Sequence, residues 1–210
     1  MAMFARVTAV RSDPARVEQG IAGFKERVAP MVRAAPGYAG IAMLVDRDSG
    51  DGFGVTYWDT LADLNAAEQL GQEGRRQTRE SIGAEVIDVD RFEMVLVHRA
   101  AEPSTPVFSR VNQLYADPQR IDETIAFVRD RVVPAVSALK GYQSLLMGAN
   151  RMTGRCVVST AWKTPQDRAA SEPAVLDQRR QAAAIAGAKD VEVRLLEVPF
   201  AEIKQATRAR

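Results

Sequence analysis

The sequence contains an internal repeat of one structural unit, and this repeat restricts the fold more than any other feature of the sequence. The stretch TYWDTLAD begins at Thr56 and a close copy, TAWKTPQD, begins at Thr160, so that the two tryptophans lie 104 positions apart. A shift of that length aligns the halves without a gap over about ninety residues, with roughly a third of the pairs identical, which chance does not sustain. The chain is therefore a tandem duplication.

The repeat also predicts the domain boundaries. The first copy spans residues 1–98 and the second spans residues 108–200. Between them lies RAAEPSTPV, residues 99–107, whose two prolines and small polar residues are typical of a semi-rigid linker. We expect residues 201–210 to form a C-terminal tail.

Each copy reads as strand, helix, strand, strand, helix, strand. In the first copy FARVTAV alternates like a strand, an apolar stripe at helical spacing follows, and two strands flank the turn DRDSGDG. Thr60 and Asp63 then form a T-x-x-D helix start, while Pro30, like Pro134 in the second copy, predicts a kink in the first helix. The order βαββαβ predicts an α+β fold in which each copy is a ferredoxin-like unit, with an antiparallel sheet and both helices on one face.

Two such units in one chain predict a closed barrel. A sheet that is covered by helices on one face leaves its other face bare, and that apolar area has to meet something. If the bare faces meet and the last strand of each copy reaches across, the sheet edges close into a barrel and no unpaired edge remains. We expect an intrachain pseudo-dimer of this kind. The alternative is two separate domains that each dimerise with a domain of another chain. Whether the chain also forms homo-oligomers stays open.

Composition excludes several classes of partner. Lys and Arg total 28 against 27 for Asp and Glu, so the net charge of +1 supplies no field for holding nucleic acid or an anionic membrane. No segment approaches the roughly 20 apolar residues of a membrane-spanning helix, and the start shows no secretory apolar run, which predicts a cytoplasmic protein. Cys156 is the single cysteine, which excludes an intrachain disulfide and a thiolate metal cluster, and no metal site is predicted.

The arrangement resembles a known superfamily. The pairs Gly37-Tyr38 and Gly141-Tyr142 after the first helix, the hairpin, the strand end T-x-W-x-T and the capped helix are similar to the dimeric α+β barrels, most of all to antibiotic biosynthesis monooxygenase (ABM) domains. The resemblance covers nearly the whole chain, twice. It implies the barrel fold and leaves the reaction open, because the superfamily includes cofactor-free quinone-forming oxygenases, haem-degrading enzymes, lactone isomerases and members without known activity.

The resemblance implies a pocket between the sheet and the helices of each unit. Four polar side chains of the first strands share one parity and are candidates for it: Arg6, Thr8, Arg110 and Asn112. A guanidinium or an amide that faces a core needs partners, which a ligand, a water or a salt bridge supplies. The alternative for the arginines is that they reach solvent at strand ends or pair with Glu93 and Glu197.

Asn112 carries a sharper resemblance. The stretch VFSRVNQL resembles the first strand of haem-degrading members, whose asparagine contacts the reacting ligand. Those enzymes need a histidine on the second helix, where this sequence has Gln178 near the matching position and only Gly74 and Arg75 in the first copy. The one histidine, His98, ends a strand beside the linker. We therefore disfavour haem degradation.

The arginine pairs of the second helices have a simpler interpretation. Arg75-Arg76 and Arg179-Arg180 lie among acidic residues at helical spacing. That pattern is typical of a solvated helix face held by pairs worth a few tenths of a kcal/mol each. We expect both pairs to be exposed.

The resemblance favours a cofactor-independent monooxygenase that acts on a small aromatic or polyketide-like phenol. Asn112 and Arg110 would be the electrostatic contacts to the developing phenolate, and Trp162 would shape the wall. The counterpart in the first copy would be lined by Arg6, Thr8, Tyr57 and Trp58. Because paired positions differ between the copies, the pockets are predicted to be unequal. The alternatives are a non-catalytic barrel that binds a small hydrophobic ligand or serves as a scaffold, and tryptophans that are packing anchors with bonded N–H groups.

Overall fold

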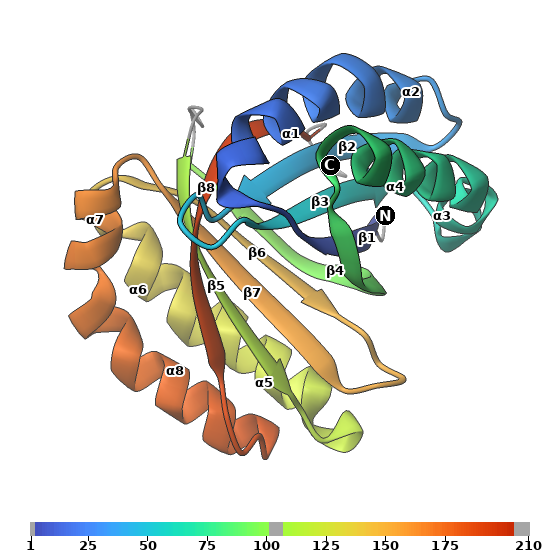
Figure 1. Ribbon diagram of the computed structural model, residues 1–210. Coiled ribbons are helices and arrows are strands. Elements are labelled where there is room, and N and C mark those ends of the chain that lie inside the picture. Colours follow the sequence, from blue (N-terminus) through green and yellow to red (C-terminus); the bar gives the residue numbers. More distant parts are fainter. Residues whose placement is uncertain (1–2, 101–106, 204–210) are drawn as a thin grey trace. The chain divides into compact units, whose positions relative to one another are not determined.

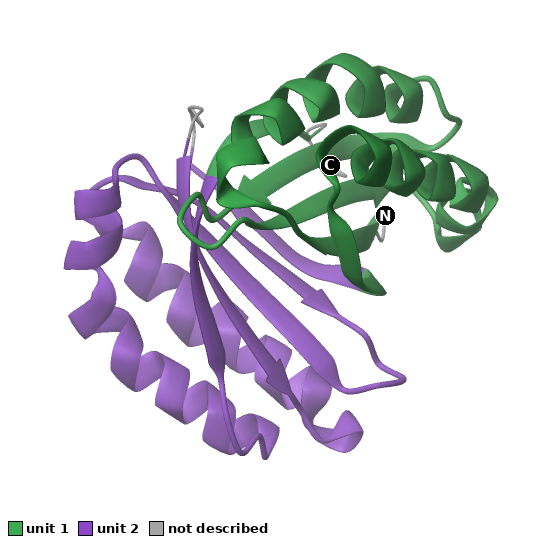
Figure 2. Ribbon diagram, in the orientation of Figure 1, with its two compact units in different colours: residues 1–92, 198–210 green, residues 93–197 purple. Residues whose placement is uncertain are grey.

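The computed structural model describes residues 3–100 and 107–203, and within them the chain divides into two compact units. Unit 1 comprises residues 1–92 and 198–210, and unit 2 comprises residues 93–197 (Figure 2). Each unit carries its helices on one face of its strands, as the sequence predicts (Figure 1).

The elements follow the predicted order in both copies. The first copy contains β1 (Met3–Arg11), η1 (Pro14–Arg16), α1 (Val17–Gly23), η2 (Phe24–Val28), α2 (Ala29–Arg33), β2 (Tyr38–Val45), β3 (Asp51–Trp58), α3 (Leu61–Ala66), α4 (Glu68–Ile82) and β4 (Glu85–Arg99). The second contains β5 (Val107–Tyr115), η3 (Pro118–Arg120), α5 (Ile121–Phe127), η4 (Val128–Val132), α6 (Val133–Ser137), β6 (Tyr142–Ala149), β7 (Arg155–Trp162), α7 (Pro165–Ala170), α8 (Glu172–Ala186) and β8 (Glu192–Ile203).

The strands form a closed barrel in the hydrogen-bonded order β1-β3-β2-β8-β5-β7-β6-β4. The neighbouring pairs are antiparallel, and the two copies share one register, since Phe4 is opposite Trp58 and Phe108 is opposite Trp162. The prediction of an α+β barrel built from two ferredoxin-like units is confirmed.

The last strand of each copy is divided between the two compact units, so the units and the sequence repeats do not coincide at their ends. In β4, Glu93 to Arg99 pair with β6 and belong to unit 2, although the repeat places them in the first copy. The end of β8 belongs to unit 1, where Glu202 accepts a hydrogen bond from Arg33 at 2.7 Å. The predicted tail therefore begins too early, because β8 continues to Ile203. Most of the predicted linker, residues 101–106, lies outside the described residues.

Helix caps and breaks lie where the sequence predicts them. Thr60 Oγ1 accepts from the Asp63 N–H at 3.1 Å, and Thr164 Oγ1 accepts from Asp167 N–H at 3.0 Å. The first helix of each copy changes from α to π winding at Phe24–Val28 and at Val128–Val132. Each π segment lies directly before the turn that holds the proline, which cannot donate to the helical ladder.

The core is packed by the inner strand faces and the helices of each unit. Ile41, Trp58 and Leu64 are fully buried in unit 1, and Leu145 and Trp162 are fully buried in unit 2. Among the described residues, no helix combines the length and the apolar character that crossing a bilayer requires.

Candidate functional site

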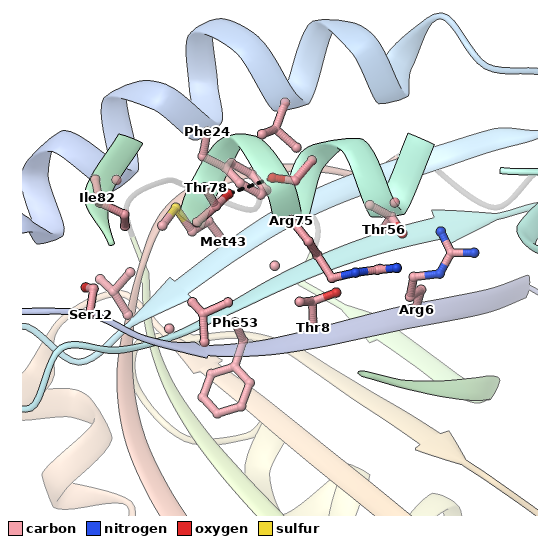
Figure 3. Close-up of a pocket in the computed structure, with 18 of the residues that line it drawn as sticks. Arg6, Thr8, Ser12, Phe24, Met43, Phe53, Thr56, Arg75, Thr78 and Ile82 are labelled. Carbon is pink, nitrogen blue, oxygen red and sulfur yellow. Dashed lines mark hydrogen bonds between the residues drawn. The ribbon is translucent and has the colours of Figure 1, made fainter. Parts of the chain in front are cut away.

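Unit 1 contains a cavity of about 90 Å³ between its strands and its helices. The floor is formed by alternate residues of β1, β2 and β3, and the roof is formed by α1, η2 and α4 (Figure 3). Most of the lining is apolar, and the polar groups gather near β1. Figure 3 shows Arg75 reaching down from α4 toward Thr8 and Arg6, while Ser12 and Ile82 lie at the other end of the cavity.

Arg6 closes one end of the cavity and is held entirely by its own unit. Its side chain is 3% exposed, it donates to the carbonyls of Ala67 (3.1 Å) and Leu64 (2.7 Å), and its Nη2 lies 2.8 Å from Glu68. The carbonyls belong to the last turn of α3, where a cation is favourable. Burial lowers the pKa of the Arg6 guanidinium, yet an arginine keeps its charge. The predicted alternative, a pair with Glu93, is wrong, because Glu93 instead pairs with Arg151 at 3.0 Å.

Arg75 has unused hydrogen-bonding capacity at this end of the cavity, in addition to the buried Nε of Arg6. Its Nη2 donates to Glu68 at 2.8 Å, but its Nη1 is buried and has no hydrogen-bond partner among the residues that the structure describes. The side chain is 17% exposed, so the prediction of a solvated arginine pair is wrong for Arg75 and right for Arg76, which pairs with acidic residues at the surface. Adjacent helical residues point about 100° apart, so the two arginines can have different surroundings.

Gly71 keeps the space between the two guanidinium groups open. A Cβ built on Gly71 would lie 2.6 Å from Arg6 Nη1 and 3.1 Å from Arg75 Nη1. Arg6 and Arg75 therefore converge on one point, and the bare backbone of α4 at Gly71 makes room for that approach. Any larger residue at this position would have to displace one of the cations.

The charges at this end of the cavity do not balance. Arg6, Arg75 and Arg91 all contact the single carboxylate of Glu68, at 2.8, 2.8 and 3.3 Å. Burial alone would raise the pKa of the Glu68 carboxyl, but the Arg75 hydrogen bond and the three positive charges hold that pKa below its ordinary value. Three cations against one carboxylate leave a local positive excess that an anion would offset.

Unit 2 contains a smaller cavity of about 60 Å³ at the equivalent place. Arg110 repeats the role of Arg6, with bonds to Ser171 Oγ and the Arg168 carbonyl (both 2.7 Å) and a contact to Glu172 at 2.9 Å. Arg110 is 2% exposed, and the alternative in which it reaches solvent or takes Glu197 as its partner is not what the structure shows. Glu172 is instead the counterpart of Glu68.

The two cavities differ in what holds the second arginine. Arg179 donates its Nε to Asn112 Oδ1 at 2.8 Å and its Nη1 and Nη2 to Glu172 at 2.9 and 3.2 Å. Asn112 lines the cavity as predicted, but its oxygen is already used. The unpartnered buried atoms of this cavity are Gln178 Oε1 and Arg110 Nε, and Arg110 Nε matches the unpartnered Arg6 Nε of unit 1. The units differ at the second arginine, because in unit 1 it leaves Nη1 unpaired within the described residues.

Solved structures share this architecture over nearly the whole chain. A protein from Fusobacterium nucleatum provisionally named a monooxygenase aligns with a TM-score of 0.74 at 12% identity, covering 97% of this chain and 95% of its own. An anthrone oxidase-like protein aligns with a TM-score of 0.68 at 14% identity, covering 99% and 95%. The fold is a dimeric α+β barrel. Identities this low establish the fold and leave the activity open.

Relatives by sequence carry no assigned activity. Two uncharacterised proteins of Mycobacterium tuberculosis are similar, one at 24% identity over 160 residues and the other at 27% over 158 residues. The matches cover 76% and 75% of this chain and 71% and 66% of the relatives. No protein-family model matches the sequence.

Two aromatic residues predicted for the pocket walls of this dimeric α+β barrel do not line either cavity. Tyr57 alternates with Thr56 and Trp58, which line the unit 1 cavity, so its side chain points to the opposite face of β3. Trp162 is fully buried, donates Nε1–H to Thr160 at 3.3 Å and packs edge-on against Tyr142 at 5.9 Å. Trp58 lines the cavity but also donates to Thr56 at 3.0 Å, so both tryptophans are packing anchors.

The histidine of the chain is placed away from both cavities. His98 Nδ1 lies 2.8 Å from the Tyr142 hydroxyl, and burial raises the pKa of Tyr142 well above its ordinary range. The helix position that would carry a haem ligand is Gln178 in unit 2 and Gly74 in unit 1, both lining residues. Neither side chain is an iron ligand of the familial kind, so the residues present do not fit a haem held from that helix.

Sequence reasoning missed the residues that make unit 1 distinctive. These are Arg75, read as surface, and a set of glycines that line the cavity: Gly20, Gly52, Gly54, Gly71 and Gly74. The signal was available in the alignment of the two copies. At these positions the second copy has side chains: Thr124, Cys156, Val158, Val175 and Gln178.

Proposed function

We propose that the chain is a cofactor-independent oxygenase of a small, electron-rich phenol, with the unit 1 cavity as its active site. The observation that carries this proposal is the buried Arg75 Nη1, a cationic donor without a partner among the described residues, at the edge of an apolar space. The likeness to an anthrone oxidase-like barrel supports the reaction class. The polar contacts proposed for the substrate are therefore Arg75, Arg6 and Thr8, in place of Asn112 and Arg110.

The cation would act on the ionisation of the phenol. A phenol bound with its oxygen at Arg75 Nη1 would have its anion favoured over its neutral form, because the donor carries a fixed positive charge in a poorly hydrated space. Arg6 adds to this field without changing position, since α3 carbonyls and Glu68 hold it. Such preorganised donors are worth most where charge develops during the reaction.

Dioxygen would then oxidise the electron-rich anion. For an anthrone, one oxygen atom forms a carbonyl at the ring methylene, the O–O bond breaks, and the second oxygen leaves as water with the two hydrogens of that methylene. Carbon loses four electrons and dioxygen gains them, so no other oxidant or reductant is required. The protein would bind and orient the anion, and its apolar walls would exclude bulk water.

The size of the cavity restricts the substrate. An apolar cavity of about 150 Å³ holds benzene in another protein. A space of about 90 Å³ therefore accepts one aromatic ring only if wall side chains move or the ring projects through the mouth. We expect single-ring and two-ring phenols to be preferred over tricyclic ones.

A second candidate is a non-catalytic binder of small anions, and the position of the lining carboxylate favours it. Among the described lining residues the carboxylate is Asp51, which accepts a hydrogen bond from Arg11 at 2.7 Å. Arg11 is five residues from Arg6, or about 17 Å along the strand, so Asp51 is too far from the Arg75 end to take a proton from a phenol bound there. The proton would have to pass to water.

Oxygen uptake decides between the two functions. The protein, dialysed against a chelator, is mixed with hydroxylated anthrones, naphthols and resorcinols in an oxygen electrode, and quinone is quantified. The oxygenase predicts one dioxygen consumed for each quinone formed, above the rate in buffer. Saturable binding of the same phenols without oxygen uptake would instead support the binder. If no phenol is bound and none is oxidised, both functions are contradicted.

A further inference from the structure

Two glycines on one strand open the unit 1 cavity lengthwise. Gly52 and Gly54 are alternate residues of β3 and both face the cavity, next to Thr56 in the same row. On β1 they lie opposite Val10 and Thr8, and on β2 opposite Val45 and Met43. The floor of the cavity therefore has a strip without side chains, which we call the glycine groove.

The groove would narrow if either glycine carried a side chain. A Cβ on Gly54 would lie 3.3 Å from Phe24 Cε2, and a Cβ on Gly52 would lie 3.3 Å from Val10 Cγ2. Both contacts are tighter than ordinary van der Waals contact. In β7 the equivalent residues are Cys156 and Val158, and the unit 2 cavity is correspondingly smaller.

The groove has a closed end at the arginines and a more open, mostly apolar end. Arg6 is 3% exposed, so the end beside it is sealed by protein. Toward the partly exposed Ser12 the lining includes Val10 and Ile82, together with the Ser12 hydroxyl and the Asp51 carboxylate, which is held by its neighbour Arg11. From Arg6 to Ser12 the strand extends about 20 Å.

We propose that the substrate is a phenol with an apolar tail, bound with its oxygen at Arg75 and with the tail in the glycine groove toward Ser12. This rests on the proposed function for the identity of the head group. The ring would lie beside Thr8 and Arg75. A cavity of about 90 Å³ does not enclose the ring and the chain together, so an unbranched chain would extend over the glycines toward the partly exposed Ser12 end. The chemical class that combines these features is the 5-alkylresorcinols, in which two hydroxyls make the ring electron-rich and the chain is opposite them.

The oxidation of such a ring balances with dioxygen alone. Resorcinol and one dioxygen give hydroxybenzoquinone and one water. A new carbonyl forms at the ring carbon para to one hydroxyl, that hydroxyl becomes the second carbonyl, and the O–O bond breaks. The ring hydrogen of that carbon and the hydrogen of that hydroxyl leave with the second oxygen as water. The alkyl chain takes no part in the reaction. Its role is binding, which allows affinity and turnover to be tested separately.

The test is a length series measured by calorimetry without oxygen, with resorcinol, its 5-methyl derivative and its 5-pentyl derivative. Burial of four further methylenes, at about threefold to fourfold for each, predicts that the pentyl compound binds about 80-fold to 250-fold more tightly than the methyl compound. A pentyl-to-methyl ratio near one in the wild-type protein would overturn the inference.

Variants locate the tail. Gly54→Val reproduces the second copy and should collapse the pentyl-to-methyl ratio to within about threefold. Gly54→Ala, a milder change, should reduce it in part and covers the case in which the valine variant does not fold. Val158→Ala in unit 2 is the matched control and should leave the ratio as it is. A full ratio in Gly54→Ala and Gly54→Val would place the tail elsewhere and overturn the inference.

Oxygen uptake separates this inference from the function on which it rests. Equal oxidation of all three compounds with no gain in affinity would contradict tail binding in the groove and support the oxygenase function. An affinity that rises with chain length, without oxygen uptake, would support a ligand with an apolar tail and contradict the oxygenase function.

Discussion

Unit 1 and unit 2 contain the same group of charged residues, which we call the charged frame: a strand arginine, a helix glutamate and a second arginine from that helix. The cavity beside this frame is lined by different side chains in the two units. In both, a buried strand arginine contacts one helix carboxylate, Glu68 or Glu172, which also pairs with a second arginine from the same helix. In unit 2 that second arginine uses Nε and both Nη atoms on Asn112 and Glu172, whereas Arg75 Nη1 is unpaired within the described part of unit 1. The frame is structural in both units, and the proposed site lies where the second arginine leaves a donor unpaired.

The filling follows from side-chain volume. Unit 1 has glycine at five lining positions where unit 2 has larger residues, and its cavity is about 90 Å³ against about 60 Å³. A glycine in the interior of a helix costs roughly 0.5–1 kcal/mol relative to alanine, and Gly71 and Gly74 both lie in α4. Unit 1 thus accepts a less stable helix and gains open space beside a cation, which is the pattern expected of a site.

Removal of the free donor should have the largest effect. Arg75→Gln should lower kcat/KM for phenol oxidation about 100-fold or more, because it removes a charged donor that acts where the anion develops. The apparent pKa of bound 4-nitrophenol, followed by its absorbance, should rise at the same time. Arg179→Gln is the matched control in unit 2 and should leave both quantities near wild type. Equal losses in the two variants would show that the units do not differ as described.

Filling the gap between the cations should have the next largest effect. Gly71→Val copies Val175 and places atoms where Arg6 and Arg75 converge, so phenol affinity should fall about tenfold or more. The reverse change, Val175→Gly, opens space in unit 2 but leaves Arg179 bonded to Asn112, so it should add no second site. Calorimetry gives the affinity and the stoichiometry, and two sites in Val175→Gly would contradict the role given to Asn112.

The sequence predicted the barrel, but it did not predict the cavity residues that distinguish unit 1, and the reason is physical. The repeat, the caps at Thr60 and Thr164 and the strand parity are local patterns, so the barrel followed from them. The parity made Arg6 and Arg110 candidates for the inner face, but whether they point inward or reach solvent stayed open. Which of Arg75 and Arg76 faces inward depends on the rotation of α4 against the sheet, which depends on packing. The same holds for Asn112, whose inward position was predicted correctly but whose partner, Arg179, comes from a helix 67 residues away.

Exchanging the residues that face the second arginine should have a moderate effect. Thr8→Asn gives unit 1 an amide oxygen that can accept from Arg75, as Asn112 accepts from Arg179, and the affinity for phenolates should fall about fivefold. Asn112→Thr should free Arg179 and give unit 2 weak anion binding in its smaller cavity. Titration with 4-nitrophenol measures both changes. An unchanged affinity in Thr8→Asn would show that Arg75 Nη1 does not carry the anion.

The smallest expected difference between the units is in the carboxylates of the frame, which tests whether that frame is common to both. For Glu68 and for Glu172, burial raises the pKa, but the arginine hydrogen bonds and charges outweigh it and hold the pKa below the ordinary 4.5. A depressed pKa in the folded state stabilises the protein above the unfolded-state value, and this stabilisation is lost as the pH falls through the folded pKa. Glu68→Gln and Glu172→Gln should each lower the free energy of unfolding at pH 7 by about 1 kcal/mol, since both carboxylates are partly exposed and screened. Chemical denaturation at pH 7 and at a pH below 4 should show this gap closing on acidification, by similar amounts in the two variants. A gap that closes for one glutamate and persists for the other would mean that the two frames are not equivalent, and that unit 2 differs from unit 1 in more than its filling.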